Sequence, residues 1–283
     1  MPSILLAGLR IVSTALNLPG PAACARMRDL GAIVTKIEPP TGDPLEGFCP
    51  AWYRRLHEGM EVRRLDLKAE HGRAALHALL EDADLLVTAQ RASALARLGL
   101  DTATLESRFP RLCHAAITGH APPDEETPGH DLTYMAVHGL VSPPRMPPTL
   151  YADMAGAERA VSTALALVIA RHREGRGRTA AVPLAEAAAF LAQPLEEGLT
   201  RPGAILGGGT PGYNLYAAGD GWIAVAALEP HFARRLAESL RLPALSAAAL
   251  GEVFARESVA HWERWGRERD LPIVAVRSPE ETK

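Results

Sequence analysis

The chain has 283 residues, of which 47% are hydrophobic and 22% charged, and its formal net charge is −3. This length allows one large domain or two modest ones with a self-sufficient core, and the composition is that of a globular protein rather than a disordered or fibrous one. The slightly negative net charge argues against nonspecific electrostatic binding of nucleic acid. No apolar run approaches the roughly 18 residues of a membrane span.

The cysteines and the N-terminus indicate the compartment. Cys24, Cys49 and Cys113 are odd in number and widely spaced. Such a set fits neither a disulfide framework nor a zinc site, so we expect a reducing cytoplasm and no metal. The apolar N-terminal segment lacks the basic start of a signal peptide, and its valines and isoleucines favour a strand.

The first 120 residues alternate apolar runs with helical patterns. Strands are predicted at residues 8–13, 32–38, 63–67, 84–88 and 112–118, and helices at 22–31, 70–81, 92–98 and 102–109. Successive strand–helix–strand units place their strands in parallel, with right-handed crossovers. The sequence therefore predicts an open, mainly parallel, Rossmann-like α/β sheet.

The first strand-to-helix turn carries Leu18-Pro19-Gly20-Pro21-Ala22. It has no G-x-G-x-x-G pattern, so binding of a dinucleotide is disfavoured. The turn still offers backbone N–H groups at a helix start, which suits an anionic ligand. A plain tight turn is the alternative, and the turn taken alone favours it.

The organisation changes in the second half. Proline-rich segments at residues 122–128 and 142–148 precede predicted helices at 155–172 and 184–191, a glycine-rich hinge at 203–212, strands at 213–216 and 222–227, and helices at 230–240, 244–254 and 258–269. Gly219-Asp220-Gly221 is typical of a hairpin turn between the two strands. We therefore expect a large α/β domain over residues 1–202, ending in long helices, and a smaller α+β domain over 203–283.

Three residues are candidates for acid–base chemistry, each with a structural alternative. His130 follows a proline-rich loop, and histidine titrates near neutrality, although a surface or structural role is the alternative that the residue taken alone favours. Asp153 lies at the start of the long helix, where aspartate is a common N-cap. Glu229 ends an apolar strand just before Pro230, where it also complements a helix dipole.

An ordered series of motifs extends over nearly the whole chain. It includes Gly8-Leu9-Arg10-Ile11-Val12, Lys36-Ile37-Glu38-Pro39-Pro40-Thr41-Gly42-Asp43-Pro44, Leu65-Asp66-Leu67-Lys68, Gly129-His130-Asp131, Gly175-Arg176-Gly177, Gly207-Gly208-Gly209-Thr210-Pro211 and Leu228-Glu229-Pro230-His231-Phe232. With these motifs the chain resembles the family III CoA-transferases, the CaiB/BaiF group, which also includes the α-methylacyl-CoA racemases. The racemase branch looks nearest.

The resemblance implies a mechanism. His130, Asp153 and Glu229 match the racemase acid/base residues. Asp153 would serve one face of a 2-methylacyl thioester, and His130, oriented by Glu229, would serve the other. Backbone N–H groups at the start of the Asp153 helix would stabilise the enolate oxygen. The alternative within the family is a CoA-transferase with Asp153 as nucleophile. A second alternative is a catalytically reduced acyl-CoA binding protein.

The resemblance also implies what the protein binds. The expected CoA-binding residues are Arg91, Gly20, Pro21, Lys36, Glu38 and Pro39. No tightly bound cofactor is expected, because CoA enters as part of the acyl-CoA substrate. Neither nucleic acid nor a membrane is expected as a partner. A homodimer is expected; the family's dimer is interlocked, and whether this chain interlocks is left open. Relatives continue beyond about Val276, so we expect a C-terminally shortened member of the fold.

Overall fold

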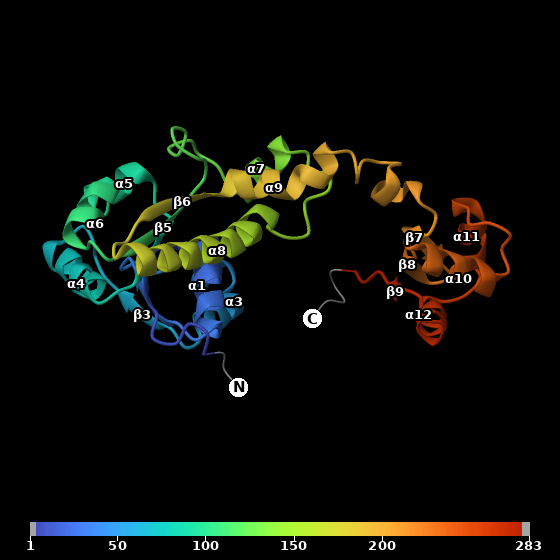
Figure 1. Cartoon of the computed structure of the whole chain (residues 1–283), viewed down its shortest axis with the longest axis horizontal. Coiled ribbons are helices and arrows are strands. Elements are labelled where there is room, and N and C mark those ends of the chain that lie inside the picture. Colours follow the sequence, from blue (N-terminus) through green and yellow to red (C-terminus); the bar gives the residue numbers. More distant parts are fainter. Residues whose placement is uncertain (1–3, 279–283) are drawn as a thin grey trace. The chain divides into compact units, whose positions relative to one another are not determined.

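The alternating runs of the first half fold into one six-stranded sheet in the computed structural model, which describes residues 4–278 (Figure 1). All five strand pairs are parallel, in the order β3-β2-β1-β4-β5-β6. The strands are β1 (Arg10–Ser13), β2 (Ile33–Glu38), β3 (Glu61–Arg64), β4 (Leu85–Thr88), β5 (Cys113–Thr118) and β6 (Thr179–Pro183). The predicted parallel α/β fold is thus confirmed, with β6 as a strand that the sequence pattern missed.

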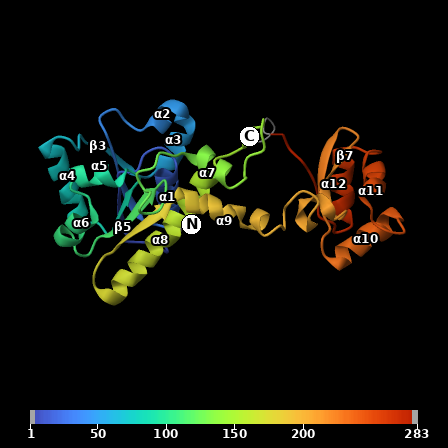
Figure 2. The ribbon, with the colours of Figure 1, turned by 90° about the horizontal axis from the view of Figure 1, so that it is seen from above.

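Helices cover both faces of this sheet (Figure 2). They are α1 (Pro19–Asp29), α2 (Pro44–Phe48), α3 (Pro50–His57), α4 (Glu70–Glu81), α5 (Ala92–Arg97), α6 (Thr102–Arg108), α7 (Asp131–Val137), α8 (Tyr151–Glu174) and α9 (Leu184–Glu196). Helices α1, α7 and α8 contribute to the hydrophobic core on one face, and α4, α5 and α6 contribute to the core on the other. The sheet is therefore doubly wound.

Strand side chains supply both cores in alternation. Ile11 and Leu85 belong to the core beneath α1 and α8, whereas their neighbours Val12 and Leu86 belong to the core beneath α4. Successive side chains of a strand point to opposite faces, so a strand buried on both sides needs a continuous apolar run. This need explains why the central strands show no alternation of polar and apolar residues.

The strand order reverses between β1 and β4. From β1 the chain continues to β2 and β3 on one side, and from β4 it continues to β5 and β6 on the other. The loops after β1 and β4 therefore diverge and leave a crevice at the carboxyl edge of the sheet. Open α/β sheets bind their ligands at such a switch point.

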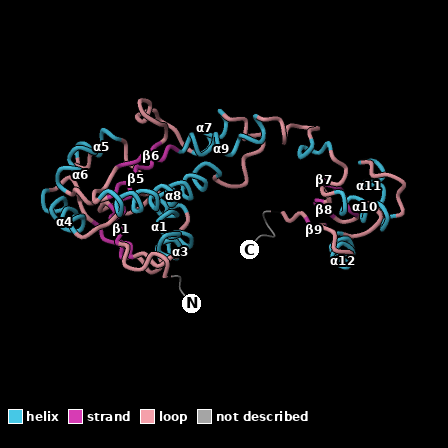
Figure 3. The backbone as a smooth tube through the Cα atoms, viewed as in Figure 1, coloured by secondary structure: helices cyan, strands magenta, loops and turns pink. Residues whose placement is uncertain are grey.

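The chain divides into two compact units, residues 1–191 and 192–283, and the second contains a three-stranded antiparallel sheet (Figure 3). Its elements are the glycine-rich turn η1 (Ile205–Gly209), β7 (Tyr213–Ala218), β8 (Gly221–Ala226), β9 (Ile273–Ala275), α10 (Pro230–Leu240), α11 (Ala247–Phe254) and α12 (Val259–Glu268). The predicted hairpin between β7 and β8 is confirmed. Ile223, Phe254 and Trp262 are among its core residues.

Helix α8, with 24 residues, is long enough to raise the question of a membrane span. It carries charged residues along its length, including Glu158, Arg159 and Arg171. Within residues 4–278, no helix combines the length and the apolarity that crossing a bilayer requires.

Helix α1 packs closely against the end of β1, which gives a first testable prediction. A Cβ at Gly20 would overlap the side chain of Ala15, which is fully buried. We expect Gly20→Ala to destabilise the protein by about 1–3 kcal/mol through overpacking. The matched control is Gly47→Ala in α2, where a Cβ meets no atom within 4 Å. Chemical denaturation measures both, and equal stability of the two variants would contradict the packing argument.

Candidate active site

A cavity of about 300 Å³ lies at the switch point of the large sheet. Leu16 and Asn17 line it from the turn after β1, and Gln90 and Arg91 line it from the segment after β4. The loop before α7 and the first turn of α8 complete the wall, bringing His130 and Asp153 to the same cavity. Two of the three residues predicted to carry acid–base chemistry are therefore neighbours around one space within the first unit.

His130 occupies the N-cap position of α7, a short helix that the sequence pattern did not predict. Its backbone N–H donates to the hydroxyl of Thr133 over 3.0 Å, and that hydroxyl donates to the His130 carbonyl oxygen over 2.8 Å. These two bonds fix the main chain at His130, while the residue itself stays exposed. His130 is therefore an exposed residue on the wall of the cavity.

Asp153 is the third residue of α8, whose N-cap is Leu150, so it is not the N-cap that the sequence suggested as the alternative. Its backbone N–H donates to Oδ1 of Asp131 over 3.0 Å. Of the backbone N–H groups at the start of this helix, which the family resemblance assigns to the enolate oxygen, that of Asp153 is therefore bonded to a carboxylate. Asp131 is buried and Asp153 is partly buried.

The electrostatic environment of Asp153 is unusual for a carboxyl group. Burial, followed by the negative charge of Asp131, raises its pKa from 3.8 to about 6, and the neighbouring His130 opposes this by lowering it. Desolvation and a like charge both disfavour the ionised form. A carboxyl with this pKa exchanges protons close to neutral pH, as a general acid or base must.

Tyr134 of α7 is buried and also lines the cavity. Its ring occupies the space that a side chain would need at Gly119 and Gly129, so both glycines are sterically required. Burial and the charge of Asp153 raise the pKa of its hydroxyl. In the sequence, the only indication that Tyr134 belongs to the site is its position shortly after the Gly-His-Asp motif.

Two more polar residues of this wall were missed by the sequence pattern. Thr118 Oγ1 and Glu125 Oε2 are buried, and neither has a hydrogen-bond partner among the residues that the structure describes. Both residues line the cavity. The loop that carries Glu125 is tethered to α5, because the Glu126 carboxylate accepts the Ser93 N–H over 2.8 Å and the Ser93 hydroxyl over 3.0 Å.

The residues expected to hold CoA occupy different environments. Arg91 is the exposed N-cap residue of α5 and lines the cavity. Gly20 and Pro21 are buried in the first turn of α1, where Pro19 is the lining residue. Pro39 lines a second cavity of about 410 Å³, which shares Leu16 and Gln90 with the first. The two cavities are therefore adjacent along the carboxyl edge of the sheet.

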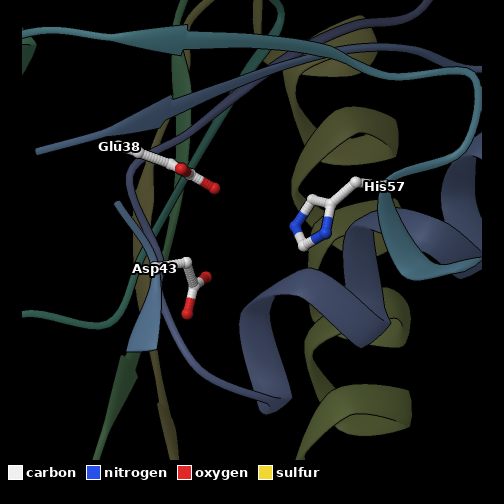
Figure 4. Close-up of side chains that lie close together, drawn as sticks. All are labelled: Glu38, Asp43 and His57. Atoms are coloured by element: carbon white, nitrogen blue, oxygen red, sulfur yellow. The ribbon is translucent and has the colours of Figure 1, made fainter. Parts of the chain in front are cut away.

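The side chains of Lys36 and Glu38 are 1% and 0% exposed. Figure 4 shows Glu38 together with Asp43 and His57, whose donor atoms lie within 4.8 Å of one another. Carboxylate and imidazole groups at this spacing have the chemistry of a metal site. Here the ammonium group of Lys36 lies among them, forming ion pairs with both carboxylates. A metal ion at this position would have to displace that ammonium group.

Glu229 belongs to the second unit, where it is the N-cap residue of α10 without a side-chain capping bond. His130 belongs to the first unit, and the structure places Glu229 only relative to the rest of the second unit. Its expected contact with His130 therefore stays a prediction.

Comparison with known proteins gives a consistent result. A family model described as CoA-transferase family III matches residues 6–283. The chain is 30% identical over 292 residues to the α-methylacyl-CoA racemase of Mus musculus, covering 92% of this chain and 74% of that protein. It is 34% identical over 227 residues to the cinnamoyl-CoA:phenyllactate CoA-transferase of Clostridium sporogenes, covering 70% of this chain and 55% of that enzyme.

Solved structures agree on the fold. A hypothetical protein from Mycobacterium tuberculosis superposes with a TM-score of 0.84 at 24% identity, covering 98% of this chain and 85% of that chain. A CaiB/BaiF family protein from Brucella suis superposes with a TM-score of 0.81 at 22% identity, with the same two coverages.

Asp131 raises the pKa of Asp153 and His130 lowers it, so substitutions of these two neighbours should shift this pKa in opposite directions. Asp131→Asn keeps an oxygen able to accept the Asp153 N–H but removes the negative charge, so the pKa of Asp153 should fall below about 6. His130→Gln removes the group that lowers this pKa and should raise it. NMR titration of ¹³C-labelled aspartate, assigned with Asp153→Asn, measures both. Shifts of the same sign in the two variants would show that these neighbours do not set the pKa.

Proposed function

Because the chain belongs to CoA-transferase family III, we propose that it binds acyl-CoA thioesters and racemises a 2-methylacyl-CoA by moving a proton at the α-carbon. The observation that carries this proposal is the presence of His130 and Asp153, from two different elements, around one cavity at the switch point. Inversion at carbon needs a base on one side of the α-carbon and an acid on the other.

The proposed reaction has two steps. With one stereoisomer of the substrate, the Asp153 carboxylate takes the α-proton, and the electron pair of the C–H bond moves to the thioester oxygen to give an enolate. The imidazolium of His130 then gives a proton to the opposite face of the α-carbon. For the other stereoisomer the two residues exchange roles. After one turnover Asp153 is protonated and His130 is neutral, which is the state that converts the opposite stereoisomer.

The environment of Asp153 supports this use. The pKa of its carboxyl, raised to about 6 by burial and by Asp131, makes it a stronger base than an exposed aspartate while leaving it ionised at neutral pH. Its proximity to His130, which lowers this pKa, also indicates that the two groups affect each other electrostatically. We propose that Glu229 acts on His130 as a positioning residue.

The proposed CoA site follows the carboxyl edge of the sheet. Arg91 offers a positive charge beside the first cavity, and Pro39 lines the adjoining second cavity, so together the two cavities extend the site beyond the reacting carbon. Ligands of open α/β sheets occupy this edge. We further propose a homodimer and a cytoplasmic location, which size exclusion and fractionation test.

Exchange with solvent tests the proton transfer directly. The protein incubated with a 2-methylacyl-CoA in D2O should incorporate deuterium at the α-carbon, because the returned proton comes from a group that equilibrates with water. We expect Asp153→Asn and His130→Gln each to lower this rate by about 10²-fold or more. Mass spectrometry of the recovered thioester measures the incorporation.

Two controls match these substitutions. Asp101→Asn changes an N-cap aspartate of α6, and His71→Gln changes an exposed histidine of α4, and neither residue lines the cavity. Both should exchange at the wild-type rate. Wild-type protein that binds the thioester without incorporating deuterium would refute the racemase proposal.

The alternative reaction is CoA transfer, which the 34% identity to a CoA-transferase favours. In that reaction Asp153 attacks the thioester carbonyl and CoA thiolate leaves, which gives an aspartyl anhydride. CoA thiolate then attacks the aspartyl carbonyl, the acyl group leaves as its carboxylate, and an aspartyl-CoA thioester forms. Intact-mass spectrometry after incubation with acyl-CoA distinguishes the two reactions. We expect no covalent adduct, whereas an adduct that Asp153→Asn abolishes would establish the transferase.

A further inference from the structure

A buried cluster of charged and polar side chains lies behind the two cavities. Its centre is Lys36 of β2, with an exposed fraction of 1%. The Lys36 ammonium pairs with Oδ2 of Asp43, lies 3.5 Å from Oε1 of Glu38 and lies 2.8 Å from Nε2 of His57. Figure 4 shows the Glu38, Asp43 and His57 side chains converging from three separate segments.

The tautomer of His57 follows from its two contacts. Its Nδ1 lies 2.7 Å from the carbonyl oxygen of Tyr53, which can only accept, so Nδ1 carries the proton. Nε2 is then free to accept a hydrogen from the Lys36 ammonium. Burial and the positive charge of Lys36 both lower the pKa of His57, which keeps the imidazole neutral in this role.

Glu38 completes the cluster on its other side. Its Oε1 accepts the Tyr53 hydroxyl over 2.8 Å, and its Oε2 lies 3.8 Å from Nε of Arg64. Removing one partner of a buried ion pair leaves an uncompensated charge, so such clusters resist rearrangement. The side chains of Lys36 and Glu38 are 1% and 0% exposed, although Glu38 is one of the residues that line the second cavity.

Asp43 connects this cluster to the candidate site. One of its oxygens, Oδ2, is paired with Lys36, and the other, Oδ1, accepts the backbone N–H of Asn17 over 3.0 Å and that of Leu45 over 2.9 Å. Asn17 has φ = +63°, in the left-handed region that few residues other than glycine adopt. The hydrogen bond that the Asn17 N–H donates to the fixed Asp43 carboxylate is a physical means of holding Asn17 in this conformation.

The turn that Asp43 holds forms part of both cavities. Leu16 lines each of them, and Asn17 lines the one that contains His130 and Asp153. The segment 38–41, which lies between Lys36 and Asp43 in the chain, lines the second cavity. The cluster thus lies behind two adjoining walls of the site without lying in the reacting space beside Asp153.

We propose that Asp43, anchored by buried Lys36, is a positioning residue for the acyl-CoA site, which fixes the turn at Leu16 and Asn17 against the ligand. Lys36 thereby acts on CoA binding through Asp43 rather than by direct contact. This inference rests on the proposed acyl-CoA activity. Loss of the Asp43 contacts should change the affinity for the ligand and not the rate of proton transfer, because His130 and Asp153 are held by other contacts.

The test compares Asp43→Asn with Asp101→Asn. Both aspartates are N-caps whose side chains accept backbone N–H bonds, but only Asp43 is paired with a buried lysine. Calorimetric titration of the full chain with CoA and with acetyl-CoA should give a dissociation constant about tenfold weaker for Asp43→Asn, and unchanged for Asp101→Asn. The deuterium-exchange rate at saturating 2-methylacyl-CoA should stay within about threefold of wild type.

Each result decides something different. If the wild-type protein binds neither CoA nor acetyl-CoA, the acyl-CoA proposal itself fails. If the wild type binds and folded Asp43→Asn binds equally well, or loses exchange rate without losing affinity, the positioning role is refuted while the acyl-CoA proposal stands.

A second variant covers the case in which Asp43→Asn does not fold. His57→Gln leaves the ionic charges of the cluster in place and removes only the imidazole that accepts from Lys36. It should weaken CoA binding severalfold, with circular dichroism like that of the wild type. A folded His57→Gln with wild-type affinity would overturn the positioning role.

Discussion

The parallel arrangement of all six strands in the large sheet is the constraint on which the rest of the first unit depends. Parallel neighbours require crossovers, the crossovers bring helices to both faces, and the sheet is consequently buried on both sides. Polar chemistry is thereby confined to the edges of the sheet. At the carboxyl edge the order of strands reverses between β1 and β4, and the loops that diverge there form the cavity containing His130 and Asp153.

Two partly or fully buried aspartates of this edge show how the surroundings of one residue type set different chemistry. Asp43 is ion-paired with the ammonium of Lys36 and accepts backbone N–H groups. Burial and, second, the negative charge of Asp131 raise the pKa of Asp153 to about 6. The first arrangement suits the holding of a turn, and the second suits proton exchange.

Much of the fold could be predicted from the sequence, because four of the six large-sheet strands, β1, β2, β4 and β5, contain apolar, mostly buried runs, whereas β3 is exposed and lies at Glu61–Arg64 rather than at the predicted 63–67. Strand β6 was missed, since Thr179–Pro183 is short, rich in alanine and ends in proline, and it becomes a strand only by pairing with β5. Helix α7 was missed for a similar reason. It has seven residues, and tertiary packing of Tyr134 and Met135 stabilises it more than helix propensity does.

The sequence by itself determined the parallel α/β class, the hairpin of the second unit and the membership of the family, because periodicity, turn residues and ordered motifs are local properties of the chain. It also identified His130 and Asp153 as candidates. Only the tertiary structure decided that these two share a cavity, that burial and Asp131 raise the pKa of Asp153, and that the side chains of Lys36 and Glu38 are buried. Burial and electrostatic coupling depend on tertiary contacts between segments far apart in the chain, and local sequence patterns do not specify these contacts.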